Sequence, residues 1–346
     1  MFFRIKTLFE LGFKLTIHIF DYGRGKQEEL ARYGKVHYYR RNFSVFQLLS
    51  KIPFIVLSRK STELLENLKG DEDPIWFEGI HTTIFIDHPN LKNRLKFIRT
   101  HNIEHEYYQH LAKNSTFPKN IFFSLESNKL KKYEAKLKYA DQIFAIKDRD
   151  VHHFSKINEN SNRLSAFISK DVSEFRETKN YALFHGNLSV IENENAVYWI
   201  HSKIKSEINN DFGLIIAGKN PSKNIKRFCS ENQLKLIANP NGAEMSELIE
   251  NARVHVFHSA SDSGVKLKLL NALKTCGHLL TTENLIFEED VESLCVIGRN
   301  ESDFLEKFRL LKSKTLSKEQ FENRKRFFDD YFLNQDKVFR SLLNNH

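Results

Sequence analysis

The stretch His258-Ser-Ala-Ser-Asp-Ser-Gly-Val-Lys-Leu-Lys-Leu-Leu-Asn-Ala-Leu273 decides the fold that this sequence predicts. It follows a short apolar run, Val254 to Phe257, and its second half carries apolar residues at helical spacing. A strand that enters a helix through a small polar loop leaves the first N–H groups of the helix unpaired, and these groups can bind a phosphate. The stretch therefore predicts a strand, loop and helix of a parallel α/β sheet, with an anion site at the start of the helix.

The predicted helix has one narrow polar face. On a helical wheel, Gly264, Lys268, Asn271 and Thr275 share that face. Most of the remaining surface is apolar, contributed by Val265, Leu267, Leu269, Leu270, Ala272 and Leu273. Lys266 and Lys268 stand in the first turns, where the helix dipole disfavours cations unless an anion is bound. A local conflict of this kind is expected at a functional site.

The same stretch resembles the nucleotide-sugar signature of GT-B glycosyltransferases, in particular glycosyltransferase family 4 (bacterial glycosyl transferases group 1). In that signature a strand leads into Ser-Gly-Val-Lys-Leu-Lys-Leu-Leu-x-Ala-Leu, then a glycine and a second strand, which Gly277 and residues 278–282 supply here. Three further stretches share the resemblance, which spans about residues 75 to 282: Phe184-His-Gly-Asn-Leu-Ser-Val-Ile-Glu-Asn-Glu-Asn195, Ile215-Ile-Ala-Gly-Lys219 and Arg99-Thr-His-Asn-Ile-Glu-His-Glu-Tyr107.

The resemblance implies an α/β protein of GT-B type, with two Rossmann-like, doubly wound domains facing across a cleft. It also implies a retaining, metal-independent hexosyltransferase. Such an enzyme moves a sugar from a nucleotide diphosphate donor, UDP- or GDP-linked, to a glycan or lipid-linked acceptor in bacterial surface polysaccharide synthesis. No cofactor is expected, because helix amides and lysines can stabilise the diphosphate leaving group.

The sequence departs from the family at one pair of positions. The family usually carries two glutamates eight positions apart around this helix, and the matching residues here are Ser263 and Asn271. The second glutamate normally holds the donor ribose. Asn271 can hydrogen-bond a hydroxyl, but a neutral amide binds it more weakly than a carboxylate does. A catalytically silent protein or subunit that binds nucleotide sugars therefore remains the alternative.

The donor site implied by the resemblance consists of Gly186, Asn187, Lys219, Ser263, Gly264, Val265, Lys266, Lys268 and Asn271. In this scheme Lys266, Lys268 and the amides of the helix start hold the diphosphate. The loop at 186–187 follows the first strand of the second domain, at the strand end where open α/β sheets bind ligands. Lys219 takes the place of a basic pair found in relatives, or is an ordinary surface lysine.

Two loops of the first domain supply the predicted acceptor side. A histidine near the position of His101 lies beside the transferred sugar in the family, which makes His101 the predicted catalytic residue. The neighbouring candidates on the two loops are Glu78, His81, Arg99, Asn102, Glu104 and His105. Two plainer interpretations stay open: Glu104 and His105 form a local pair, and residues 78–83 form a helix N-cap cluster that needs no ligand.

Length and composition favour a two-domain globular protein. At 346 residues the chain is long for one hydrophobic core. We expect an N-terminal, acceptor-side Rossmann-like domain at 1–168 and a C-terminal, nucleotide-sugar-binding Rossmann-like domain at 181–315. Hydrophobic periodicity lapses between residues 167 and 180, which predicts a linker there. Residues 316–346 are expected to form a helix that returns to the N-terminal domain, as such tails do in the family.

Apolar runs separated by helical segments predict parallel strands in both halves. They fall at 14–20, 36–39, 75–77, 95–98 and 142–146, and then at 181–184, 213–217, 234–237, 254–257 and 278–281. A helix is predicted at 2–11, ahead of the first strand. Because a doubly wound domain ordinarily opens with a strand, the N-terminal domain is expected to lack its usual first one.

The net charge of +9 and the pI near 9.2 point to an anionic partner. The absence of a nucleic-acid-binding motif favours phosphate-bearing small molecules or an anionic membrane surface over DNA or RNA. A predicted helix at 119–139 turns its lysines outward, either to solvent or to a membrane. Three widely spaced cysteines form no disulfide or zinc pattern, and no apolar run is long enough to span a bilayer. We expect a cytoplasmic protein, soluble or peripheral at the inner face of the membrane.

Overall fold

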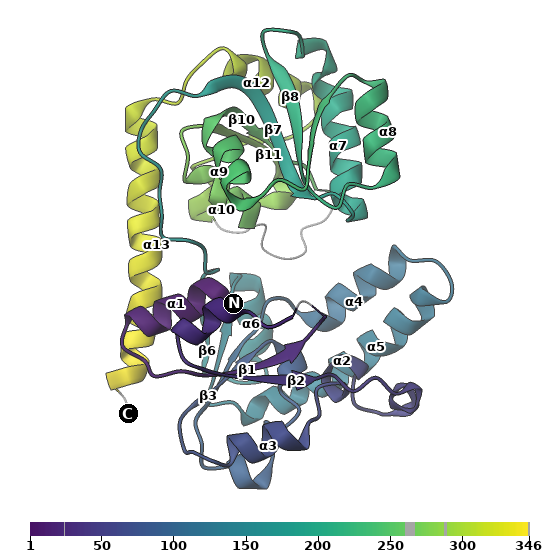
Figure 1. Ribbon diagram of the computed structural model, residues 1–346, viewed down its shortest axis with the longest axis vertical. Helices are drawn as coiled ribbons and strands as arrows, with labels where there is room; N and C mark the ends of the chain where they lie inside the picture. Colours follow the sequence, from purple (N-terminus) through teal and green to yellow (C-terminus); the bar gives the residue numbers. More distant parts are fainter. Residues whose placement is uncertain (24, 260–266, 287–288, 345–346) are drawn as a thin grey trace. The chain divides into compact units, whose positions relative to one another are not determined.

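The structure, a computed structural model, describes residues 1–344 except 24, 260–266 and 287–288. The chain forms two compact units (Figure 1). Unit 1 comprises Met1–Phe167 and Gln335–His346, and unit 2 comprises Ile168–Asn334. Among the described helices, none has the length and apolar character needed to cross a membrane.

Unit 2 is built on a parallel sheet, six-stranded in the part of the chain that is described. Its strands are β7 (Lys179–Asn187), β8 (Gly213–Lys219), β9 (Lys235–Ala238), β10 (Ala252–Val256), β11 (His278–Thr282) and β12 (Val296–Gly298). The strand order is β12-β11-β10-β7-β8-β9. The order reverses between β7 and β10, and ligands of doubly wound sheets bind beyond the carboxyl ends of the strands at such a point.

Five described helices pack against this sheet: α7 (Ile191–Ile204), α8 (Lys223–Glu231), α9 (Gly242–Asn251), α10 (Leu267–Leu273) and α12 (Glu301–Lys312). The other described helices of this half of the chain are α11 (Glu289–Glu292) and α13 (Lys318–Asn344), whose last residues belong to unit 1. Figure 1 shows α7 and α9 on opposite sides of β7. The strands carry continuous apolar runs, as expected for strands that are buried on both faces. Ser222 and Asn300 cap α8 and α12, and Asn241 forms a capping box with Glu244 at α9.

The described residues of unit 1 form two parallel sheets. One has the order β3-β4-β5-β6, formed by β3 (Ile75–Glu78), β4 (Lys96–Arg99), β5 (Gln142–Ala145) and β6 (Ser161–Arg163). The other pairs β1 (Thr16–Asp21) with β2 (Lys35–Arg40). The sequence predicted the first five strands of the chain, but it missed β6 and, in unit 2, β12. Both span three residues, which is too short for an apolar period to show.

The helices of unit 1 are α1 (Phe2–Glu10), α2 (Phe54–Leu57), α3 (Thr62–Leu68), α4 (Glu104–Lys113), α5 (Lys119–Tyr133) and α6 (Asp148–Ser155). The helix predicted at 119–139 changes at Glu134 into the 3-10 helix η5 (Glu134–Tyr139). Along this segment Leu130, Tyr133 and Leu137 are buried in the core, and Phe123 is half-buried. At the end of α13, Phe339 packs between the rings of Trp76 and Phe167.

Candidate functional site

A lysine lies at the carboxyl ends of β7 and β10, where the strand order of unit 2 reverses. This place is called the switch point of unit 2. Lys268, on α10, donates to Asn193 Oδ1 at 3.2 Å, and Asn193 Nδ2 in turn donates to the carbonyl of Asn187 at 2.9 Å. The Lys268 ammonium lies 4.7 Å from the ring centre of Phe184 and 4.9 Å from that of Phe257. Aromatic faces attract a cation, so these contacts fix the amine in place. The predicted diphosphate lysine thus stands where a doubly wound sheet binds its ligand.

A buried histidine lies beside Lys268. His185 is 7% exposed, and its Nε2 has no hydrogen-bond partner among the described residues. Burial, and then the charge of Lys268, lower the pKa of His185 to about 3. The imidazole is therefore neutral at neutral pH. His185 shares this layer with His255, whose Nε2 lies 3.2 Å from Thr275 Oγ1, so the predicted polar-face residue Thr275 is bonded inside the fold.

Two glycines let β7 and β8 approach closely. A Cβ placed at Gly218 would overlap the carbonyl oxygen of Gly186, so the packing of the strands requires glycine at 218. At Gly186 a Cβ would lie 3.2 Å from Asn193 Nδ2. Lys219 ends β8 directly opposite Asn187, and its side chain is exposed. Asn187 and Lys219 therefore share the strand edge that Lys268 reaches.

The remaining predicted donor residues differ in how far they can be placed. Ser263, Gly264, Val265 and Lys266 lie outside the described residues. Asn271 is half-buried on α10, one turn beyond Lys268. Lys268 and Asn271 therefore lie one turn apart on the same helix, as the sequence predicted. The amides at the predicted start of the helix lie outside the described residues.

Sequence reasoning missed an aromatic stack at the end of β10. His258 stacks on Trp199 with 4.0 Å between ring centres and 10° between planes, and its Nδ1 lies 3.2 Å from Thr282 Oγ1. Burial, then Lys268 and Lys203, lower the pKa of His258 to about 4. The stack was not predictable, because Trp199 reads as an ordinary apolar position of α7. Asn193 lies in the stretch 184–195, which carries part of the family resemblance, but nothing in that stretch marked it as the partner of Lys268.

In unit 1, Glu78 at the end of β3 gathers the predicted catalytic histidine and a buried arginine. Its Oε1 lies 3.0 Å from His101 Nε2, and its Oε2 accepts from Trp76 Nε1 at 3.3 Å and pairs with Arg4. Arg4 lies on α1 and was missed by the sequence analysis. Burial, and then Arg99, lower the pKa of Arg4 to about 9, so the guanidinium stays charged at neutral pH. The carboxylate thus balances a buried cation and positions His101.

Two of the three histidines on the predicted acceptor side, His101 and His81, are neutral at neutral pH. Burial lowers the pKa of His101 to about 3, and the charges of Arg99 and Arg4 add to the effect. Burial also lowers the pKa of His81 to about 3, with contributions from Arg59, His101 and Arg41. A neutral imidazole has one donor and one acceptor nitrogen. When His101 donates from Nε2 to Glu78, its Nδ1 remains an acceptor for a hydroxyl.

The other predicted acceptor residues take different places. Arg99 is 2% exposed, donates to the carbonyl of Ser165 at 2.9 Å and lies 5.0 Å from the ring centre of Phe167. Asn102 is half-buried in the loop after β4. Glu104 begins α4, where burial and then the charge of Glu134 raise its pKa to about 7, against the effect of Arg59. Residues 80–82 form only a 3-10 turn, in which the Thr82 hydroxyl donates to the carbonyl of residue 79 at 2.9 Å.

A cavity of about 550 Å³ opens within unit 1 beside these groups. Its lining includes Glu78, His81, Thr82, Arg59 and Tyr38. Small-molecule sites have volumes of roughly 300–1,000 Å³ and combine apolar walls with a few polar groups. The cavity therefore brings two of the predicted acceptor-side residues, Glu78 and His81, to one space of suitable size.

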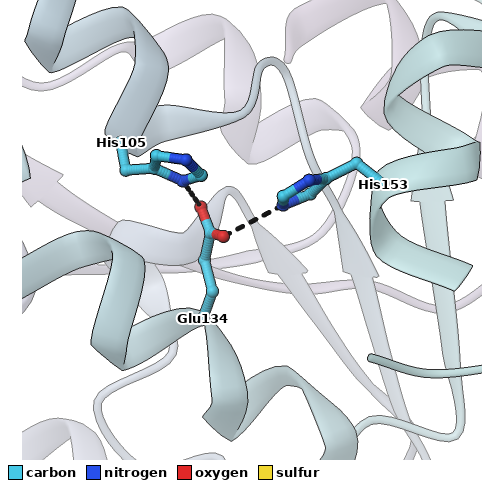
Figure 2. A group of neighbouring side chains, drawn as sticks. All are labelled: His105, Glu134 and His153. Atoms are coloured by element: carbon cyan, nitrogen blue, oxygen red, sulfur yellow. Dashed lines mark hydrogen bonds and ion pairs between the residues drawn. The ribbon is translucent and has the colours of Figure 1, made fainter. Parts of the chain in front are cut away.

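His105 does not pair with Glu104, as one interpretation of the sequence expected, but with Glu134 (Figure 2). His105 Nδ1 lies 2.7 Å from Glu134 Oε1, and His153 Nε2 lies 3.0 Å from Glu134 Oε2. Each of the three side chains offers one atom that could bind a metal ion, and these atoms all lie within 4.8 Å of one another. Two imidazoles and a carboxylate suit a zinc ion. In the structure each carboxylate oxygen instead accepts a hydrogen bond from one imidazole, so the three side chains satisfy one another.

Comparisons with solved structures show the fold of the chain. Anabaena Alr3699/HepE in complex with UDP and glucose is similar with a TM-score of 0.69 at 8% identity, over 100% of this chain and 95% of that one. A UDP-forming α,α-trehalose-phosphate synthase from Burkholderia vietnamiensis is similar with a TM-score of 0.62 at 10% identity. The match covers 88% of this chain and 78% of the synthase. TarM is similar with a TM-score of 0.56 at 13% identity, over 84% of this chain and 60% of TarM. These neighbours are GT-B glycosyltransferases, and the chain has the same two-domain, Rossmann-like GT-B fold.

The chain spans about 60% of the length of TarM and of the GtfA/B structure that it also matches. No protein-family model matches the sequence, and no curated protein matches it.

Proposed function

We propose that this protein is a glycosyltransferase that moves a sugar from a nucleoside diphosphate donor to a glycan or lipid-linked acceptor. The observation that carries the proposal is the position of Lys268 at the switch point of unit 2, held by Asn193 and two aromatic faces. The likeness to a GT-B protein in complex with UDP and glucose supports a UDP-linked donor. A GDP-linked donor is the other outcome that a screen of nucleotides can give.

In this proposal Lys268 contacts the donor diphosphate. A charge-assisted bond from an ammonium to a phosphate oxygen is roughly twice as strong as a neutral one. As the bond between sugar and diphosphate breaks, negative charge grows on the phosphate, and a fixed cation stabilises that charge. Lys219 and the loop at Asn187 share the same strand edge and would complete the donor side.

On the acceptor side we assign His101 as the catalytic residue. Glu78 accepts from His101 Nε2 and leaves Nδ1 to accept from a hydroxyl of the sugar or of the acceptor. Glu78 and His81 line the cavity of unit 1 and offer further contacts to hydroxyl groups. Arg99 and Arg4 act through their charge and packing, as positioning residues. Retention of configuration, independence from metal ions and a role in bacterial surface polysaccharide synthesis at the inner face of the membrane belong to the same proposal.

A screen of nucleotides by thermal unfolding tests the donor side. UDP, GDP and their free nucleosides are added to the full chain, and the diphosphate that binds is expected to raise the unfolding temperature. A ligand at a hundred times its Kd stabilises the folded state by about 2.7 kcal/mol. Release of the nucleoside diphosphate from the matching sugar nucleotide then measures turnover. A chain that none of these nucleotides stabilises would contradict the proposal.

A second candidate function is supported by Asn271, which stands where the family carries its ribose-binding glutamate. A neutral amide at this place weakens the donor site and favours a catalytically silent protein that binds nucleotide sugars. The two candidates differ in turnover and agree in binding. Binding of a nucleoside diphosphate without release from any sugar nucleotide, across a panel of glycan and lipid-linked acceptors, would select the silent protein.

A further inference from the structure

Unit 1 exposes a short segment of large apolar side chains. The 3-10 helix η2 (Val45–Leu49) has no buried residue. Within it Val45 is 80% exposed, Phe46 83% and Leu49 86%, and Phe43 just before it is 67% exposed. Single exposed apolar residues are common on protein surfaces, but a run of this kind marks an interaction site.

The start of α5 extends this apolar surface. Ile121 and Leu125 are 50% and 57% exposed, and their spacing of four residues places them on one side of the helix, while Phe117, 77% exposed, lies in the turn just before it. Figure 1 shows α5 paired with α4. A hydrogen bond of 2.8 Å from Lys129 Nζ, one turn further along α5, to the carbonyl of Leu48 joins the helix to η2. The two segments are therefore neighbours, and their exposed apolar side chains are together called the apolar face: Phe43, Val45, Phe46, Leu48, Leu49, Phe117, Ile121 and Leu125.

The charges around the apolar face have one sign. Residues 40–60 contain no aspartate or glutamate, and their cations at the surface are Arg40, Arg41, Lys51 and Lys60, while Arg59 is buried. Residues 113–132 contain Lys113, Lys119, Lys129, Lys131 and Lys132. The acid in that second range, Glu126, is buried and paired with Lys129. An apolar face with a basic surround matches a bilayer that carries anionic headgroups.

The apolar face adjoins the acceptor side. The Arg41 guanidinium lies 4.6 Å from the ring centre of Phe43, and Arg41 is one of the cations that act on His81. His81 lines the cavity of unit 1. A membrane that contacts the apolar face would thus bring a lipid-borne group close to that cavity.

We propose that the apolar face at residues 43–49 and 117–125 inserts into the surface of an anionic bilayer and holds unit 1 there. The apolar side chains leave water on binding, and the surrounding lysines and arginines contact the headgroups. This binding does not depend on sugar transfer. It deepens the proposed function, because it selects a membrane-borne acceptor over a soluble glycan.

Co-sedimentation of the full chain with vesicles tests the proposal. Vesicles of phosphatidylcholine are compared with vesicles of equal parts phosphatidylcholine and phosphatidylglycerol, and binding is expected to the mixed vesicles alone. Replacing Phe46 and Leu49 together by serine should weaken binding about tenfold or more, since burial of apolar side chains is lost. Lys51→Glu with Lys119→Glu should weaken it too, and more at low salt than at high salt.

Matched controls come from unit 2, where Leu310 is 51% and Leu333 50% exposed. Leu310→Ser with Leu333→Ser should leave vesicle binding unchanged. A Phe46→Trp variant should shift its emission to the blue on the mixed vesicles and be quenched by brominated lipid, whereas Leu310→Trp should not change. All substituted side chains are exposed, and circular dichroism checks that the variants fold.

The proposal is overturned if the wild-type chain does not bind the mixed vesicles. It is also overturned if the variant with Phe46→Ser and Leu49→Ser binds vesicles as well as wild type does. The same holds if the unit 2 control loses as much vesicle binding as that variant. Self-association that the same variant abolishes, without vesicle binding, would assign the face to a second copy of the chain and overturn the membrane role. Nucleotide stabilisation measured on the same variant stays at the wild-type value if only the membrane contact is lost, which separates this test from that of the donor site.

Discussion

The polar groups at the strand ends of the two units are arranged in different ways. In unit 1, Glu78 brings Arg4 and His101 into one network, so a carboxylate balances the buried cation. In unit 2, Lys268 is held at the switch point by the side-chain amide of Asn193 and by two aromatic faces. The comparison teaches that the network of unit 1 is centred on a carboxylate, whereas that of unit 2 is centred on a lysine ammonium, which in our proposal meets the donor diphosphate.

The neighbouring histidines follow from the same arrangement. His101 and His185 are both neutral at neutral pH, because burial and adjacent cations lower the pKa of each to about 3. In unit 1 the network gives His101 a fixed hydrogen bond to Glu78, while in unit 2 Nε2 of His185 has no partner among the described residues. The following changes test whether the two arrangements differ as described, from the largest expected effect to the smallest.

Removal of the Glu78 charge should destabilise unit 1 strongly. Glu78→Gln leaves the buried Arg4 without its carboxylate, and breaking a buried ion pair costs about 3–5 kcal/mol. Urea unfolding of a Trp199→Phe background, in which Trp76 reports on unit 1, measures the loss. Glu10→Gln is the control, because the Lys6–Glu10 pair is at the surface and should contribute less than about 1 kcal/mol. Equal losses in the two variants would contradict a buried network at Glu78.

Acid should destabilise unit 2 in part through His185. The unfolded pKa of histidine is 6.5 and the folded pKa of His185 is about 3, so between these values the unfolded state binds the extra proton. Stability is therefore lost as pH falls from 6.5 towards 3, and between pH 6.5 and 4 one such group accounts for about 3 kcal/mol. His185→Gln, in a Trp76→Phe background that reports on unit 2, should lose less stability over this range. Parallel pH curves for the two proteins would show that His185 does not stay neutral on folding.

Asn271 should contribute a smaller amount to donor binding. Asn271→Leu removes the amide at similar volume, and a lost neutral hydrogen bond with its unpaired partner costs about 1–2 kcal/mol. Asn271→Glu should bind the donor at least as well as wild type, because a carboxylate accepts more strongly from hydroxyls. Calorimetric titration with the identified donor measures both. Unchanged affinity in Asn271→Leu, with the fold intact by circular dichroism, would remove this residue from the site.

Chelation should have the least effect. If lysine and helix amides stabilise the leaving diphosphate, activity should survive EDTA. Loss of activity that Mg²⁺ or Mn²⁺ restores would contradict this mechanism. The same experiment examines His105, Glu134 and His153: a lower unfolding temperature of unit 1 in EDTA, restored by zinc, would show that these side chains hold an ion and do not only bond one another.

Sequence alone predicted the elements that have a strong local pattern. Continuous apolar runs gave the buried strands β7, β8 and β10, and the helix at Lys268 followed from its spacing of apolar residues. The GT-B fold followed from the resemblance of these stretches to a known family. β6 was missed because Ser161-Asn162-Arg163 contains no apolar residue, and its pairing with β5 depends on the assembled sheet.

The partners of the candidate site residues were not predictable in the same way. Arg4 and Glu78 are distant in sequence, and so are Lys268 and Asn193. No local spacing records which residues the folded chain brings together. Glu134 was missed as the partner of His105 because it reads as one of several charged positions on a lysine-rich helix. Local pattern thus predicted which loops carry polar groups, and tertiary packing decided how those groups pair.

Calorimetric titration of Lys268→Ala tests the central claim most directly. The wild type and the variant are titrated with UDP and with uridine, and Lys226→Ala, an exposed lysine of α8, serves as the control. The account predicts that Lys268→Ala weakens UDP binding by about 1.5–3 kcal/mol, tenfold or more in Kd, and leaves uridine binding unchanged, because only the phosphates meet the ammonium. Equal losses for UDP and uridine, or a loss for UDP no larger than that of Lys226→Ala, would contradict it.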